Sequence, residues 1–322
     1  MEAVHSAHKI FSNIVSRAGQ LGTVDTAVIF PFSEVSLRGA IEAANEGLIR
    51  PVMIGPRQDL VAYATGLDLD ISEHEFIDVP TDAAAAAAGV KLCRDGRAEA
   101  LMKGSLHTDV LMHAALDDVK GLRAHRRISH VFVLDVPSYP RMLMITDAAV
   151  NIYPTLLDKV DITQNAIDLA HVFGITDPKV AILSAVETVT PKIISTVDAA
   201  ALCKMADRGQ ITGGTLDGPL AFDNAVNLKA AEIKHIHSRV AGQADVLVVP
   251  DLESGNMLAK QLEYLAGARA AGTVLGARVP IVLTSRADNA DTRLASCAVA
   301  VLMAHERRRA GDAPDLTGIH HD

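Results

Sequence analysis

The chain has 322 residues, of which 39 are acidic and 30 basic, so its formal net charge is −9. This acidic balance argues against binding to the nucleic-acid backbone, because that function requires a basic surface. Hydrophobic residues make up 49% of the sequence but aromatic residues only 3%, so the core is expected to be aliphatic. At this length two lobes are expected rather than one.

The three cysteines, Cys93, Cys203 and Cys297, lie far apart in the sequence and form no CxxC motif. This pattern indicates neither a disulfide framework nor a cysteine zinc site, and it fits a reducing compartment. The first residues lack the basic start and apolar core of a signal peptide, and no apolar run reaches the ~20 residues of a membrane span. We therefore expect a cytoplasmic protein that binds neither a membrane nor nucleic acid.

Short apolar runs alternate with helical patterns along the chain. Strands are predicted at 26–31, 50–55, 98–104, 127–136, 141–154, 179–185, 244–251 and 279–285, and helices at 33–47, 81–96 and about 289–306. Continuous apolar strands between helices are typical of a largely parallel sheet that is buried on both faces. The sequence thus predicts an α/β fold. We place the C-terminal helix with the first lobe, which gives lobes of 1–140 with 288–322 and of 141–287.

Small polar, charged or glycine residues follow the apolar part of five of the predicted strands and the further stretch "QITGGTL" (210–216). Any one group is simply explained as a helix cap or a turn. In open α/β sheets, however, ligands bind beyond the carboxyl ends of the strands, so six such groups are expected to converge on one cleft. The candidates are Lys103 and Gly104; Thr146, Asp147 and Asn151; Ser184 and Glu187; Asp217, Gly218 and Pro219; Asp251, Glu253, Gly255 and Asn256; and Ser285, Arg286, Asp288 and Asp291.

The residue types indicate an anion site with a general base. Arg286 carries a planar, permanent charge that suits phosphate or carboxylate, and Gly104 and Gly255 allow a backbone to approach a ligand closely. Asp288 and Asp291 are candidate bases. The sequence contains neither GxGxxG nor GxxxxGK[ST], so it lacks the fingerprints of a dinucleotide site and of a P-loop.

Several longer stretches resemble the phosphate acetyl/butyryltransferase family, and they follow one another in the same order over about 20–305. They include "LMKGSLHTDVLMHAAL", "RRISHVFVLDVP", "MITDAAVNIYP", "VVPDLESGNMLAK" and "VLTSRADNADTRLAS". The stretches "DRGQI…DGPLA" and "LTSRAD" are most similar to the short phosphate butyryltransferases.

The resemblance implies a fold of two α/β lobes like that of isocitrate and isopropylmalate dehydrogenases, with the active-site cleft between the lobes. It also implies reversible conversion of acyl-CoA and phosphate to acyl phosphate and CoA. Butyryl or a similar short acyl group is the expected substrate, and acetyl is the alternative. CoA is a substrate, no cofactor is permanently bound, no metal takes part, and members form homodimers or larger assemblies.

By the same resemblance, the family's Ser-Arg pair matches Ser285 and Arg286. Arg286 is then expected to stabilise developing negative charge, with a supporting hydrogen bond from Ser285. The catalytic aspartate of acetyl-specific relatives falls on Thr292 here. Asp291 beside it is the favoured base, and Asp288 is the alternative.

Two other matches concern substrate binding. Ser129 and His130 lie in a matching block and are expected to contact substrate. Tyr264 stands where acetyl-specific relatives have an arginine, and a further family arginine falls near Met112 and His113. These missing cations favour the butyryl-like branch, with Tyr264 lining the cleft.

Two functions from other classes stay open. A metal-dependent NAD(P) dehydrogenase of the same fold would need clustered aspartates, and Asp217, Asp223 and Asp251 do not match that pattern. An inactive relative is supported by the departure at Thr292 and opposed by the retained Ser285–Arg286 pair.

Overall fold

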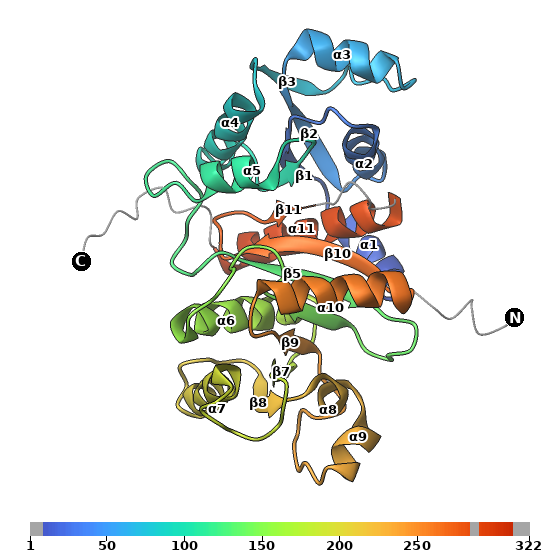
Figure 1. The fold of residues 1–322 in the computed structure, drawn as a ribbon. Helices are drawn as coiled ribbons and strands as arrows, with labels where there is room; N and C mark the ends of the chain where they lie inside the picture. Colours follow the sequence, from blue (N-terminus) through green and yellow to red (C-terminus); the bar gives the residue numbers. More distant parts are fainter. Residues whose placement is uncertain (1–8, 284–289, 312–322) are drawn as a thin grey trace, which may run out of the picture. The chain divides into compact units, whose positions relative to one another are not determined.

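The structure is a computed structural model that describes residues 9–283 and 290–311 (Figure 1). The chain forms two compact units. Unit 1 consists of Met1–Phe11 and Arg127–Ala270, and unit 2 of Ser12–Arg126 and Ala271–Asp322. The division into lobes near residues 140 and 287 stays a prediction.

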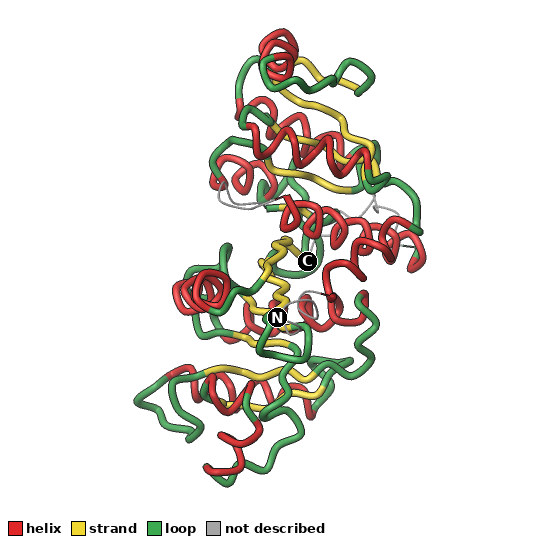
Figure 2. The backbone as a smooth tube through the Cα atoms, turned by 90° about the vertical axis from the view of Figure 1, so that its right-hand side faces the viewer, coloured by secondary structure: helices red, strands yellow, loops and turns green. Residues whose placement is uncertain are grey.

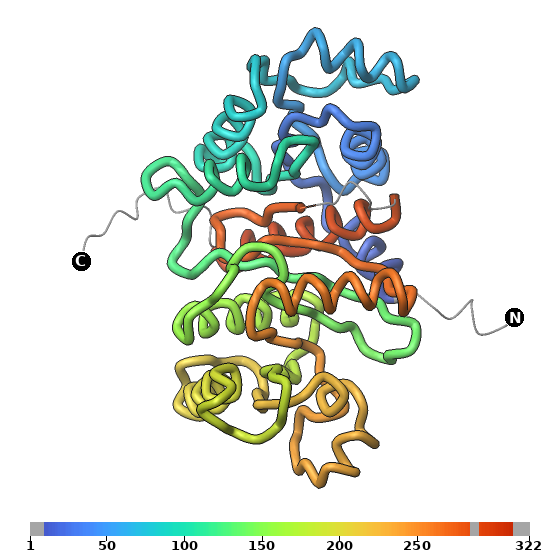
Figure 3. The backbone as a smooth tube through the Cα atoms, viewed as in Figure 1, coloured from blue at the N-terminus to red at the C-terminus, as the bar shows by residue number. Residues whose placement is uncertain are grey.

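Unit 2 contains a sheet whose strand order is β3-β2-β1-β4-β11-β10. All its pairings are parallel except β10 with β11. Figure 3 follows the chain through these elements. They are α1 (Lys9–Gly19), β1 (Val24–Ile29), α2 (Glu34–Asn45), β2 (Ile49–Gly55), α3 (Arg57–Thr65), β3 (Glu75–Asp78), α4 (Asp82–Arg94), β4 (Ala100–Lys103), α5 (Thr108–Ala115), β10 (Arg269–Leu275), β11 (Ile281–Val282) and α11 (Ala290–Ala310).

Unit 1 contains the strand order β5-β6-β9-β7-β8, in which only β5 and β6 are antiparallel (Figure 2, strands yellow). Its elements are β5 (Ser129–Asp135), β6 (Leu143–Thr146), α6 (Leu156–Val172), β7 (Lys179–Leu183), α7 (Ile194–Asp207), β8 (Thr215–Leu220), α8 (Phe222–Val226), α9 (Leu228–Ile233), β9 (Val246–Val248) and α10 (Leu252–Leu265).

Helices cover both faces of the unit 1 sheet. Parallel crossovers are right-handed, so α6 and α7, which step in one direction across the sheet, share a face and contact each other. The segment α8–α9 steps back and takes the other face. There Ala225, Ala231 and Ala259 pack into one core, which places α10 on that same face.

Helix starts follow from local capping. The Ser33 side chain accepts a hydrogen bond from the Ser36 backbone in a capping box before α2, and Thr81 caps α4 in the same way. Thr155 and Asp158 form a second capping box before α6. Such caps satisfy backbone N–H groups that have no partner within the helix. Helix α4 itself contains a run of alanines, and alanine has the highest intrinsic helix propensity.

The predicted fold class is confirmed: this is an α/β fold with a mostly parallel sheet and helices. Two details were wrong. The predicted strand 141–154 ends at Thr146, because Asp147 turns the chain by accepting backbone hydrogen bonds from the residues that follow. Asp217, Gly218 and Pro219 were expected beyond a strand end but lie within β8. Among the described strands β8 pairs with β7 alone, and an edge strand tolerates proline.

In the part of the chain that the structure describes, no helix is long and apolar enough to cross a membrane.

Candidate functional site

The loop after β6 is organised by the buried carboxylate of Asp147, whose side chain is 2% exposed. Its Oδ1 accepts hydrogen bonds from the backbone N of Ala149 (2.9 Å) and Val150 (3.0 Å). Its Oδ2 accepts from Asn151 N (3.1 Å) and Asn151 Nδ2 (2.5 Å). Burial raises the pKa of Asp147 above its usual range, and these four bonds oppose that rise.

Asn151 joins this loop to the start of β5. Its Nδ2 also donates to the carbonyl of Ile128 at 2.9 Å, and its Oδ1 accepts from Arg127 Nε at 2.8 Å. The hydroxyl of Thr146 donates to the carbonyl of His130 at 2.9 Å. The structure therefore brings together the predicted residues after β6 and those at the start of β5.

Ser129 and His130 are both buried within unit 1. Ser129 Oγ accepts a hydrogen bond from Asn165 Nδ2 at 2.9 Å. The ring of His130 packs edge-on against Phe132 with centroids 4.6 Å apart, and its Nδ1 has no hydrogen-bond partner among the described residues. Burial, with a smaller effect of the Lys260 charge, lowers the pKa of His130 to about 3. Its imidazole is therefore neutral at physiological pH.

The first turn of α10 packs directly on the loop after β6. Asp251 caps the helix, and its Oδ1 accepts from the backbone N and hydroxyl of Ser254 at 2.8 Å each. A Cβ atom at Gly255 would lie 2.7 Å from the carbonyl oxygen of Asp147, so only glycine allows this approach. Asn256 Nδ2 donates to the Ala148 carbonyl at 3.1 Å.

Glu253 and Tyr264 are exposed on the same helix. Tyr264 follows Asp251 by thirteen residues, which corresponds to about 20 Å along a helix axis. The structure therefore does not bring Tyr264 to the first turn of α10.

Polar groups also follow β7 and β8. The hydroxyls of Ser184 and Ser195 lie 2.8 Å apart, and Glu187 Oε2 lies 3.4 Å from Lys234 Nζ.

At β8 a Cβ on Gly218 would lie 2.7 Å from the carbonyl of Ile182. Asp217 Oδ1 accepts from the backbone N of Gly218 at 2.8 Å. The Cys203 thiol donates to the Gly218 carbonyl at 3.7 Å, and burial raises its pKa to about 12, which disfavours the thiolate form.

In unit 2 the corresponding groups follow β4. Lys103 ends the strand in a buried position, and its Nζ donates to the Gly104 carbonyl at 3.3 Å. Gly104 N donates to the Ile29 carbonyl at 2.9 Å, and a Cβ at Gly104 would lie 2.2 Å from that oxygen. Glycine is therefore required where the chain leaves β4 and passes the end of β1.

The polar segment before α11 is described only in part. Ser285, Arg286 and Asp288 lie outside the described residues. Asp291 is exposed in the first turn of α11, and Thr292 beside it is buried.

Sequence reasoning missed Arg293, which is 6% exposed. Its Nη2 lies 3.7 Å from Glu42 Oε2, and a Cβ on Gly39 would lie 2.7 Å from its Nε. The available signal was the pair Thr292–Arg293, which repeats the hydroxyl and guanidinium of Ser285–Arg286 seven residues later.

Within residues 9–283 and 290–311, no group of three or more His, Cys, Asp or Glu side chains is placed to hold a metal ion. The described polar groups include hydroxyls, amides and the Lys103 ammonium. Such groups can hold an anionic or acyl substrate through hydrogen bonds.

Comparison with known proteins defines the class. Residues 82–301 match the family model described as phosphate acetyl/butaryl transferase, and the chain belongs to this family. It is therefore an acyltransferase that acts with phosphate.

Individual relatives narrow the match. The chain is 60% identical to a phosphate acetyltransferase of Rhizobium meliloti, over 93% of this chain and 95% of the relative. It is 40% identical to a phosphate butyryltransferase of Clostridium beijerinckii, over 92% and 98%. The crystal structure of a branched-chain phosphotransacylase from Enterococcus faecalis V583 superposes with a TM-score of 0.75 at 28% identity, covering 88% of this chain and 99% of that one.

These identities favour the acetyl alternative over the butyryl substrate that the sequence motifs suggested. Short stretches such as "LTSRAD" cover only a few residues, so they carry little information on acyl length. Identity over the whole chain also samples residues that shape the rest of the site.

Proposed function

We propose that the protein transfers an acetyl group between CoA and phosphate, acetyl-CoA and phosphate being interconverted with acetyl phosphate and CoA. The observation that carries this proposal is 60% identity to a phosphate acetyltransferase over nearly the whole of both chains. CoA enters as a substrate, no cofactor stays bound, and the protein acts in the cytoplasm as a homodimer or larger homo-oligomer.

In the proposed mechanism Asp291 accepts the thiol proton of CoA. A thiol is mostly protonated near neutral pH because its ordinary pKa is roughly 8.5. Removal of that proton as the sulfur attacks the acyl carbonyl of acetyl phosphate gives a thioester and releases phosphate. The exposure of Asp291 in the first turn of α11 supports this role, because a substrate can reach it. Asp288 is the alternative base.

Arg286 is proposed to stabilise the oxyanion and the departing phosphate, with a hydrogen bond from Ser285. Lys103 and Gly104 at the end of β4, and the residues of the first turn of α10, are each proposed to bind substrate, and a bound substrate has a lower entropic barrier to reaction.

The test is phosphate-dependent release of CoA thiol from acetyl-, propionyl- and butyryl-CoA, measured in parallel with EDTA present. We expect release to require phosphate and to be fastest with acetyl-CoA. Faster release from butyryl-CoA would restore the butyryl assignment. Absence of release from all three would contradict acyl transfer, and reactions without phosphate control for simple thioester hydrolysis.

A further inference from the structure

Arg127 occupies the point at which the chain enters unit 1, directly after Arg126, the last residue of the first unit 2 segment. Its backbone N donates to Asp161 Oδ2 at 2.8 Å, and its carbonyl accepts from Asn165 Nδ2 at 2.9 Å. Both partners belong to α6. The entering chain is therefore fastened to that helix through its main chain.

The side chain of Arg127 is fastened separately, to the loop after β6. Nε donates to Asn151 Oδ1 at 2.8 Å, and Nη1 lies 3.4 Å from Asp158 Oδ1. The Arg127 side chain is 53% exposed, whereas Asn151 is only 4% exposed. One hydrogen bond thus joins a surface guanidinium to a buried amide.

The amide of Asn151 can be oriented in only one way. Its oxygen must face the donor on Arg127, and its nitrogen must face two acceptors, the Ile128 carbonyl and Asp147 Oδ2. An aspartate here would place an oxygen against both acceptors, and an alanine would leave all three groups unpaired. Asn151 therefore connects the entry segment to the carboxylate that shapes the loop.

The same loop supports the first turn of α10, through the Asn256 bond to the Ala148 carbonyl and the close approach of Gly255 to Asp147. A shift of the loop would consequently move the helix turn that carries predicted substrate-binding residues. A direct contact between Arg127 and a phosphate is disfavoured, because Asp158 and Asp161 both lie beside Arg127 and offset its charge.

We propose that Arg127 and Asn151 act as a pair of positioning residues for acyl transfer, which fix the loop after β6 to the point where the chain enters unit 1. This inference rests on the phosphate acetyltransferase function proposed above. In this proposal neither residue contacts substrate, and both act through Asp147 and the first turn of α10.

The test is a double-mutant cycle of Arg127→Ala and Asn151→Ala, with kcat and KM measured for both acetyl-CoA and phosphate. Each single variant is expected to lose about 10- to 100-fold in kcat/KM, since small displacements of a site have effects of this size. The kcat/KM of the double variant is expected to lie within about threefold of that of the more impaired single variant, because the same connection is broken in all three variants. Losses should be equal for the two substrates, and Arg127→Lys, which keeps the charge but not the Nε bond, should stay impaired.

Losses that multiply in the double variant would overturn the proposal. So would a rise in KM for phosphate alone that Arg127→Lys reverses, since that would show a charge contact with substrate. Arg239→Ala serves as the matched control, because this exposed arginine lies elsewhere in unit 1 and should leave kcat/KM unchanged. Asn151→Ala removes a buried group. If that variant fails to fold, the kinetics of Arg127→Ala, at a half-exposed position, decide whether the proposal holds.

A second measurement does not depend on activity. Amide hydrogen exchange at Ala149 and Val150, whose N–H groups bond Asp147, is expected to be at least about tenfold faster in Arg127→Ala than in the unaltered protein. Unchanged exchange would overturn the connection even if activity fell. If the unaltered protein showed no phosphate-dependent thiol release, the proposed function would be contradicted. The exchange data would still decide whether Arg127 holds the loop after β6.

Discussion

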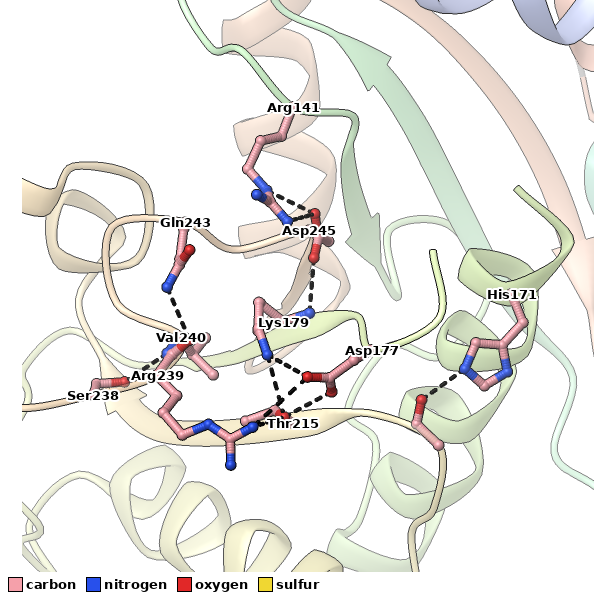
Figure 4. Close-up of polar contacts among 11 residues, drawn as sticks. Arg141, His171, Asp177, Lys179, Thr215, Ser238, Arg239, Val240, Gln243 and Asp245 are labelled. Atoms are coloured by element: carbon pink, nitrogen blue, oxygen red, sulfur yellow. Dashed lines mark hydrogen bonds and ion pairs between the residues drawn. The ribbon is translucent and has the colours of Figure 1, made fainter. Parts of the chain in front are cut away.

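Carboxylates at the two ends of the unit 1 strands have different hydrogen-bond partners. The end at which β7, β8 and β9 begin is called the amino edge here, and the end at which they finish is called the carboxyl edge. At the amino edge, where β7, β8 and β9 begin, Asp245 Oδ1 accepts from Arg141 Nε at 2.8 Å and Asp245 Oδ2 from Lys179 N at 2.8 Å (Figure 4). Next to it, Asp177 accepts from Lys179 Nζ at 2.5 Å and from Thr215 Oγ1 at 2.7 Å. At the carboxyl edge, the bonds to Asp147 all come from amide groups among the described residues.

The difference separates holding strands together from shaping a site. At the amino edge an arginine and a lysine form ion pairs with the carboxylates, and these contacts join the starts of three strands. At the carboxyl edge amides and hydroxyls bond Asp147 and Asp251, whereas Glu187 lies 3.4 Å from a lysine, and glycines allow close backbone approaches. We infer that the amino edge contributes mainly to stability and the carboxyl edge mainly to function, and variants at both edges and at Arg286 and Arg293 test this.

The largest effect is expected from Arg286→Ala, since removal of a charge-stabilising donor costs on the order of 10²- to 10³-fold in kcat. Folding should be unchanged by circular dichroism, and Arg239→Ala, an exposed arginine of the amino edge, should retain normal turnover. Arg293→Lys is the second comparison, because Arg293 is buried against α2. If Arg293→Lys abolished turnover while Arg286→Ala did not, the catalytic guanidinium would be Arg293.

At the amino edge, Asp245→Asn is expected to lower the free energy of unfolding by about 2–3 kcal/mol, because it weakens bonds to a buried carboxylate and leaves Arg141 without a charged partner. The kcat/KM of the folded variant should stay within about twofold of the unaltered protein. Urea unfolding and steady-state kinetics on one preparation would check both. A large loss of kcat/KM without loss of stability would break the distinction between the edges.

At the carboxyl edge, Gly255→Ala is expected to cost about 1–2 kcal/mol of stability, because the new methyl group meets the Asp147 carbonyl and forces the backbone to shift. It should also lower kcat/KM, since the shift moves the first turn of α10. Gly19→Ala is the matched control, because a Cβ there meets nothing within 4 Å. Normal kinetics in Gly255→Ala would show that this edge is as purely structural as the other.

The sequence predicted those elements whose signal is local. β1, β2 and β4 each contain a short apolar run, and each was placed within two residues of its observed start. β10 was missed because "RAAGTVL" is rich in alanine and glycine, which are weak strand formers. The Asp-Gly-Pro of β8 has the composition of a turn, and only its place at the sheet edge explains why it is a strand.

The candidate site was predictable in composition but not in connectivity. The stretch "TDAAVN" indicated polar residues after a strand, and burial of Asp147 by the residues that follow it is a local effect. The bond from Arg127 to Asn151 spans 24 positions, and that from Asn256 to Ala148 spans 108. Such partners are chosen by the packed fold, so no periodicity or spacing in the chain identifies them.

At neutral pH the smallest effect is expected from His130, because its contribution to stability changes only in acid. The pKa of His130 is lowered to about 3 from an ordinary value near 6.5, so the unfolded chain binds this proton before the folded one does. The stabilisation from neutral His130 is therefore complete above pH 6.5 and is lost as the pH falls from 6.5 towards 3, by at most about 1.4 kcal/mol per pH unit. His130→Phe should flatten urea-unfolding stability over this range, whereas His237→Gln at an exposed position should not. An equal slope in both variants would mean that His130 binds its proton at the same pH in the folded and unfolded states, which would contradict the lowered pKa at this edge.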